Sequence, residues 1–83
     1  MYKAKIYVTL KEGVLDPQGQ AVRAGLISQG FAAVEDVRIG KFMEVVVDAH
    51  SATAAHAVVR EMCDRLLANP VIEDYTFVLE EMA

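Results

Sequence analysis

The chain lacks the residues that mark several classes of protein. Its 83 residues include one cysteine, two prolines and no tryptophan. A single cysteine cannot form an internal disulfide, so the sequence excludes a disulfide-stapled secreted scaffold and favours a reducing compartment. No apolar run approaches the roughly 20 residues that a membrane-spanning helix needs, and the short stretch after Lys5 does not form a signal peptide. We therefore expect a cytoplasmic protein with no membrane partner.

Positive charge is also scarce. The chain has 8 Lys and Arg against 12 Asp and Glu, a net charge of -4, whereas nucleic-acid phosphates favour dense Lys and Arg. We expect no nucleic-acid partner. Apolar side chains make up 54% of the residues, against about 45–50% in typical soluble domains. One small domain, residues 1–83, has too little interior to bury all of them, which indicates an oligomer or a bound partner.

The first half of the chain predicts a strand and a helix. Apolar residues alternate over residues 2–10, a period of two that is typical of a half-buried strand. Asp16 and Pro17 form a strong helix start, because Asp caps free N–H groups and Pro needs no N–H at the first helical position. The helix is expected to run to about Gln29, with Gly30 as a left-handed stop. The helical glycines Gly19 and Gly25 indicate close approach to a sheet or a neighbouring chain.

The second half predicts a hairpin and another helix. Residues 31–48 alternate around Gly40-Lys41, which we expect to form the turn of a β-hairpin. Ser51 is a good N-cap for a second helix that runs to about Ala68. The expected apolar stripe of this helix consists of Ala52, Ala55, Val59, Met62, Cys63 and Leu66.

A last strand, with Tyr75, Phe77 and Leu79 on one face, completes the order β-α-β-β-α-β. This order predicts an α+β fold, a two-layer sandwich of the ferredoxin-like order in which two helices cover one face of a four-stranded antiparallel sheet. The other face of the sheet would be uncovered. It would carry Tyr7, Phe42, Val46 and Val78, enough apolar surface to form the interface of a homodimer.

No set of residues in the sequence predicts catalysis, cofactor binding or a metal site. His56 and Cys63 are seven residues apart on one predicted helix, about 10 Å along its axis, whereas a nucleophile and its base must be in contact. His50 and His56 are not one helical turn apart, and no carboxylate or thiol completes a ligand set with them. Scattered carboxylates such as Glu12 and Glu44 are explained as charges on a solvated face.

Two segments of the sequence resemble a known family. Residues 8–22, VTLKEGVLDPQGQAV, and residues 37–41, VRIGK, are similar to PurS, the small subunit of phosphoribosylformylglycinamidine (FGAM) synthase. The resemblance extends over the whole chain in length and element order. It implies a non-catalytic subunit of an amidotransferase in de novo purine synthesis, present as a homodimer or larger assembly. Such a subunit bridges a glutaminase (PurQ) and a synthetase (PurL) and supports the transfer of ammonia between them, while the synthetase uses ATP and Mg²⁺.

The candidate interface residues are those of the uncovered sheet face, the first loop and the predicted hairpin tip: Tyr7, Gly13, Val14, Leu15, Asp16, Pro17, Arg38, Lys41, Phe42, Val46 and Val78. For Val14 and Leu15 two interpretations remain open, contact with a partner or burial under the edge of the sandwich. Two other functions also remain open. One is a dimeric small-molecule-sensing module of the ACT type, and the other is a small dimeric enzyme that uses a base such as His56.

Overall fold

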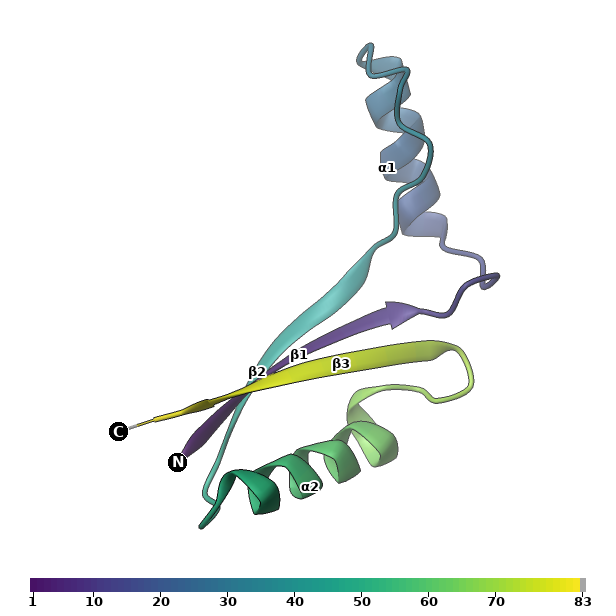
Figure 1. The fold of residues 1–83 in the computed structure, drawn as a ribbon. Coiled ribbons are helices and arrows are strands. Elements are labelled where there is room, and N and C mark those ends of the chain that lie inside the picture. Colours follow the sequence, from purple (N-terminus) through teal and green to yellow (C-terminus); the bar gives the residue numbers. More distant parts are fainter. Residues whose placement is uncertain (83) are drawn as a thin grey trace.

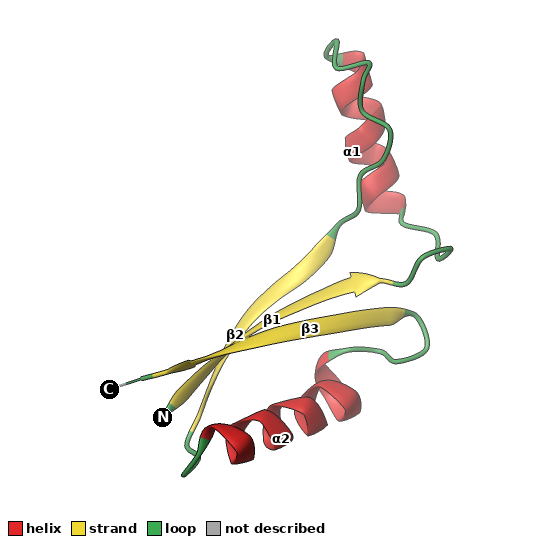
Figure 2. Ribbon diagram, viewed as in Figure 1, coloured by secondary structure: helices red, strands yellow, loops and turns green. Residues whose placement is uncertain are grey.

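The chain folds into one sheet and two helices that make very different contacts with it (Figures 1 and 2). The computed structural model describes residues 1–82. The elements are β1 (Tyr2–Leu10), α1 (Pro17–Ser28), β2 (Gly40–Val47), α2 (Ala52–Met62), a π-helical segment (Cys63–Leu67) that continues α2, and β3 (Glu73–Glu81). β1 is the central strand and pairs antiparallel with β2 on one side and with β3 on the other.

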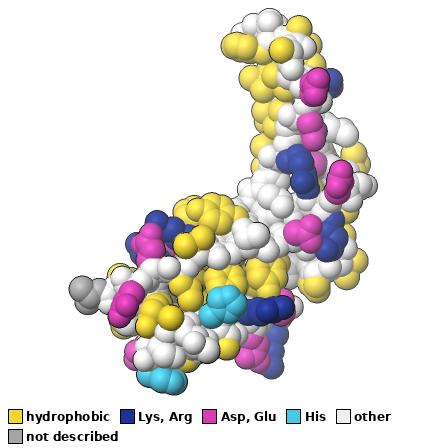
Figure 3. Space-filling view, viewed as in Figure 1, with side chains coloured by type: hydrophobic (Ala, Val, Ile, Leu, Met, Phe, Trp, Pro, Cys, Tyr) yellow, Lys and Arg dark blue, Asp and Glu magenta, His cyan; other side chains and the backbone are white. Residues whose placement is uncertain are grey.

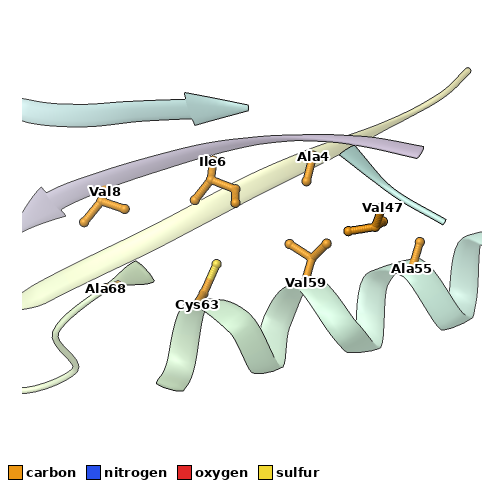
Figure 4. Packing of buried hydrophobic residues seen from close by; sticks show 8 residues of the cluster. All are labelled: Ala4, Ile6, Val8, Val47, Ala55, Val59, Cys63 and Ala68. Carbon is orange, nitrogen blue, oxygen red and sulfur yellow. The ribbon is translucent and has the colours of Figure 1, made fainter. Parts of the chain in front are cut away.

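α2 covers one face of the sheet, and the core lies between them (Figure 4). The buried hydrophobic residues of this core are Ala4, Ile6, Val8, Val47, Ala55, Val59, Cys63 and Ala68. β1 contributes every second residue and α2 every fourth, which are the periods of a strand and of a helix face. The predicted cap of α2 is confirmed, because Oγ of Ser51 accepts a hydrogen bond from the backbone N of Ala54 at 3.1 Å. Neither helix in residues 1–82 is long and apolar enough to cross a bilayer.

The predicted four-stranded sheet is wrong, because the sheet has three strands. Residues 31–39 form no strand and run back alongside α1 (Figure 2). The expected hairpin turn is wrong for the same reason: Gly40 and Lys41 are the first residues of β2. The order along the chain is therefore β-α-β-α-β.

The backbone donors of residues 31–39 explain why this segment does not pair as a strand. The N–H of Val37 donates to Oδ1 of Asp36 at 3.0 Å, and the N–H of Ile39 donates to Oδ2 of Asp16 at 2.8 Å. Carboxylates thus take donors that a neighbouring strand would need. Local side-chain acceptors of this kind compete with sheet pairing.

The prediction that both helices cover the sheet is also wrong. α1 and residues 31–39 stand away from the sheet as a projection (Figure 1), here called the arm and defined as residues 16–39. The only buried residue of α1 is Gly19. The radius of gyration is 16.4 Å and the molecule measures 51 × 29 × 14 Å, whereas a compact domain of this length has a radius near 12 Å. The arm therefore lies outside the core.

The π-helical segment changes which leucine faces the core. The N–H of Ala68 donates to the carbonyl of Cys63, five residues earlier, at 3.0 Å. This wider turn holds more residues than an α-helical turn, so the residues after Cys63 shift around the helix axis. Leu66, which the sequence places in the apolar stripe, is 82% exposed, and Leu67 packs against the core instead.

Candidate functional site

The sheet face opposite α2 carries four of the candidate residues. Tyr7, Phe42, Val46 and Val78 are 46%, 55%, 51% and 57% exposed. Tyr7 of β1 lies opposite Phe42 of β2, with ring centroids 5.0 Å apart and ring planes at 35°. Alternation along the strands therefore brings these side chains to one face, the placement that the sequence pattern predicts.

Two ion pairs cross the same face diagonally. Nζ of Lys3 lies 3.5 Å from Oε2 of Glu44, and Nζ of Lys5 lies 2.6 Å from Oε2 of Glu80. The hydrogen bond and the charge of Glu80 raise the pKa of Lys5, and the same contact with Lys5 lowers the pKa of Glu80. Two cations and two anions balance each other, so a second copy of the face can approach without net repulsion.

The loop between β1 and α1 contributes a second group of candidates. Gly13 has a φ of +86°, a left-handed conformation that favours glycine. Val14 is half-buried and its N–H donates to the carbonyl of Lys11 at 3.1 Å, whereas Leu15 is 66% exposed. Leu15 is thus more open to solvent than Val14, and contact of either residue with a partner stays a prediction.

Asp16 makes one contact that the sequence predicts and one that it does not. Its Oδ1 accepts a hydrogen bond from the N–H of Gly19 at 2.9 Å, the expected helix cap that precedes Pro17. Its Oδ2 accepts the bond from Ile39 described above. Hydrogen bonds from the Ile39 and Gly19 amides lower the pKa of the Asp16 carboxyl. Ile39 is 23 residues away in the chain, and no local pattern signals this link.

The two basic candidates do not share a hairpin tip. Arg38 is exposed on the arm, where it lines one hollow together with Gly13, Val14, Leu15 and Asp16. The structure thus joins Arg38 to the first-loop candidates.

Lys41 lies apart from that hollow, in β2. Its Nζ is 3.4 Å from Oε2 of Glu73. A hydrogen bond from the Asn69 amide and, secondly, the charge of Lys41 lower the pKa of Glu73. Lys41 therefore already has a partner within the chain.

Cys63 and His56, which the sequence offers as a nucleophile and a base, both pack against other side chains of the fold. Cys63 is buried in the core, and burial raises the pKa of its thiol, so it is a poor nucleophile. The ring of His56 packs against Phe77 with centroids 4.8 Å apart. Residues 1–82 contain no group of three or more His, Cys, Asp and Glu side chains that could hold a metal ion.

Known proteins resemble the chain over nearly its whole length. The family model for PurS, phosphoribosylformylglycinamidine (FGAM) synthase, matches residues 3–81. The FGAM synthase subunit PurS of Bacillus subtilis is 54% identical over 82 residues, which are 99% of this chain and 96% of that protein. The crystal structure of the B. subtilis protein matches with a TM-score of 0.86 at 54% identity, over 98% of this chain and 100% of that one.

Two further solved structures extend the comparison. PurS of Methanocaldococcus jannaschii, one of the subunits of formylglycinamide ribonucleotide amidotransferase in the purine biosynthetic pathway, matches at a TM-score of 0.88 and 37% identity over the whole of both chains. A chain of the PurLQS structure from Thermotoga maritima matches at 0.86 and 30% identity, over 95% of this chain and 96% of that one. The family resemblance predicted from the sequence is confirmed, and the chain belongs to the PurS family of FGAM synthase subunits.

Proposed function

We propose that this chain is the non-catalytic assembly subunit of an FGAM synthase and that it joins the synthetase subunit to the glutaminase subunit. A relative with the same fold is part of a PurLQS structure, and the curated relatives are named as PurS subunits of the synthase. The observation that carries the proposal is the arm, which leaves the sheet and is covered by nothing within residues 1–82 (Figure 1).

The arm needs a partner on physical grounds. α1 has 12 residues, a length at which an isolated helix is marginal in water. Its stability must come from packing, yet Val22, Ile27 and the following Phe31 are 42%, 39% and 59% exposed. Hydrophobic side chains line one side of the arm and charged ones the other (Figure 3). This pattern is typical of a surface that another subunit covers.

The uncovered sheet face supports self-association. We propose that Tyr7, Phe42, Val46 and Val78 meet the same residues of a second copy across a two-fold axis, because a two-fold interface requires a self-complementary surface. The charges of Lys3, Lys5, Glu44 and Glu80 balance within this face, which supports the proposal because two copies would meet without net repulsion.

In the assembled enzyme the glutaminase subunit would release ammonia from glutamine. The synthetase subunit, which would hold ATP and Mg²⁺, would transfer a phosphoryl group from ATP to the amide oxygen of formylglycinamide ribonucleotide, leaving ADP. Ammonia would then displace this oxygen as phosphate and give the amidine. The role of this chain is to keep the two subunits close together, so that ammonia passes between them without loss to solvent. The buried, unpaired thiol of Cys63 suits the reducing cytoplasm in which we expect this to occur.

The test is reconstitution of the synthase from its three separately purified subunits. Glutamine-dependent amidine formation should require this chain, whereas turnover with added ammonium chloride should depend on it much less. Full glutamine-dependent turnover without the chain would disprove the assembly function. Calorimetric titration of the isolated chain with amino acids and nucleotides distinguishes the assembly function from the ACT-type alternative. A sensor would give binding heat without the other subunits present.

A further inference from the structure

The carboxylate of Asp16 links the two chain segments at the base of the arm. The chain leaves β1 through residues 11–16 and returns to β2 through residues 37–39, and Asp16 joins these two passages by its bonds to Gly19 at 2.9 Å and Ile39 at 2.8 Å. The backbones are also in close contact there, because a Cβ atom on Gly19 would lie 2.2 Å from the carbonyl oxygen of Val37.

The outer part of the arm is fastened more weakly. Between α1 and the returning segment the exposed Nε of Arg23 donates to the carbonyl of Glu35 at 3.0 Å. A single bond from a long exposed side chain contributes little to order. The direction in which the arm leaves the sheet is therefore set mainly at its base.

We propose that Asp16 is the positioning residue that fixes the direction of the arm and so prepares the arm to contact the other subunits of the synthase. The proposal rests on the assembly function above. A segment that is already held in its bound geometry loses less conformational entropy on binding. The accepting carboxylate is suited to this role, because each of its oxygens takes one backbone N–H and the two donors come from opposite sides of the arm.

The Asp16→Asn substitution should remove the hydrogen bond that links the two sides of the arm and keep the helix cap. Asparagine is as good an N-cap as aspartate, so its amide oxygen can still accept from Gly19. Its amide nitrogen is a donor and would then face the N–H of Ile39, where no hydrogen bond can form. Asp36→Asn is the matched control, because Asp36 accepts from its own neighbour Val37 at 3.0 Å on the same returning segment but links nothing distant.

Amide hydrogen exchange of the whole protein, followed residue by residue by NMR, tests the link. In D16N the Ile39 amide should exchange about tenfold faster, the factor expected for loss of one hydrogen bond. The amides of Ala4–Val8 should keep wild-type protection, and D36N should leave Ile39 unchanged. Unchanged exchange at Ile39 in D16N would overturn the proposal, and so would an equal loss of protection in β1, because the effect would then not be specific to the arm.

Reconstitution at limiting amounts of the chain tests the consequence for assembly. D16N should raise the concentration needed for half-maximal glutamine-dependent turnover about tenfold, while the turnover at saturation stays as in wild type. Gly19→Ala would crowd both the carbonyl of Val37 and the carboxylate of Asp16, so it should act in the same direction, and D36N should match wild type. A D16N chain with a loosened Ile39 and wild-type assembly would overturn the positioning role. If wild type itself gave no glutamine-dependent turnover, the assembly function would fail, and with it the positioning role that depends on it.

Discussion

Tyr7 on β1 and Phe42 on β2 face each other across the strand pairing, with ring centroids 5.0 Å apart, on the side of the sheet that α2 leaves uncovered. Both side chains are about half exposed, 46% and 55%. Exposed aromatic pairs are typical anchors of protein interfaces, because each ring buries a large apolar area at little entropic cost. This pair is therefore the expected centre of the contact between two copies of the chain.

Phe42→Glu should disrupt the homodimer. The substitution places a charge at the centre of the proposed interface and breaks the aromatic pair, so the dissociation constant should rise by about thirtyfold or more, as for the loss of an interface hot spot. Size-exclusion chromatography with light scattering should show wild type above, and F42E near, the 9.1 kDa mass of a single chain.

Val58→Glu is the control for this experiment. Val58 is 38% exposed on α2, the helix on the opposite side of the sheet, so the same kind of substitution there should leave the mass unchanged. If F42E and V58E both keep the wild-type mass over the micromolar range, the sheet face is not the dimer interface.

Leu66 and Leu67 give a test of the π-helical segment. Leu67→Ala should lower the free energy of unfolding by about 2 kcal/mol, the lower end of the range for core leucines, because Leu67 is only partly buried. Leu66→Ala should change it by less than about 0.5 kcal/mol, because this side chain is 82% exposed. Urea denaturation of the two variants measures both values. A larger loss for L66A than for L67A would mean that a regular α-helix continues through these residues.

The sequence predicts those parts of the fold that local chemistry determines. Alternation places β1 and β3 correctly, Ser51 and Asp16 cap the two helices, and Gly30, with a φ of +99°, ends α1 as a left-handed stop. The four apolar residues of the sheet face follow from the same alternation. Each of these features depends on residues within a few positions of one another.

Other features could not be predicted, because a side-chain acceptor or a change of helix type replaces the expected pairing. Val37 and Ile39 alternate like a strand, but their donors bind the carboxylates of Asp36 and Asp16. The second bond of Asp16 has no local signal. The apolar residues of α2 follow the 3.6-residue period of an α-helix up to Cys63. The π-helical turn after Cys63 changes which of the following residues face the core. In each case a tertiary contact or a change of helix type overrides a sound local pattern.

Gly40 and Gly25 are glycines for which the structure predicts opposite effects of substitution by alanine. A Cβ atom on Gly40 would lie 2.3 Å from the carbonyl oxygen of Val8, whereas one on Gly25 would meet nothing within 4 Å. Gly19 does approach another backbone closely, but that backbone is the returning segment at Val37 and not the expected sheet or neighbouring chain. Gly25 approaches nothing within this chain, so its expected approach to a neighbouring chain stays a prediction. Gly40→Ala should destabilise the β1–β2 pairing, and Gly25→Ala should stabilise α1 by up to about 1 kcal/mol.

Thermal unfolding of the two alanine variants distinguishes these effects. G40A should melt below wild type and G25A at or above it. A melting temperature for G25A well below that of wild type would show that Gly25 lies against another copy of the chain, since the isolated chain leaves room for the added methyl group.

Acid should destabilise the chain through its paired carboxylates. The pKa values of Asp16, Glu73 and Glu80 are all lowered, by backbone amides at the first two and by Lys5 at Glu80. The pKa of such a carboxyl in the unfolded chain is about 4, and its pKa in the folded chain is lower. The carboxyl stabilises the fold at pH values above the unfolded pKa, and this contribution is lost as the pH falls through the folded pKa. In acid the unfolded chain binds more protons than the folded chain, so the urea midpoint of unfolding should decrease between about pH 5 and pH 2.

The D16N variant should show a smaller decrease of the urea midpoint in acid, because residue 16 then no longer titrates. Glu12→Gln removes an exposed carboxylate of the neighbouring loop and should leave the decrease nearly as in wild type. Equal acid sensitivity of D16N and wild type would mean that the bonds of Asp16 to Gly19 and Ile39 do not contribute to the stability of the fold.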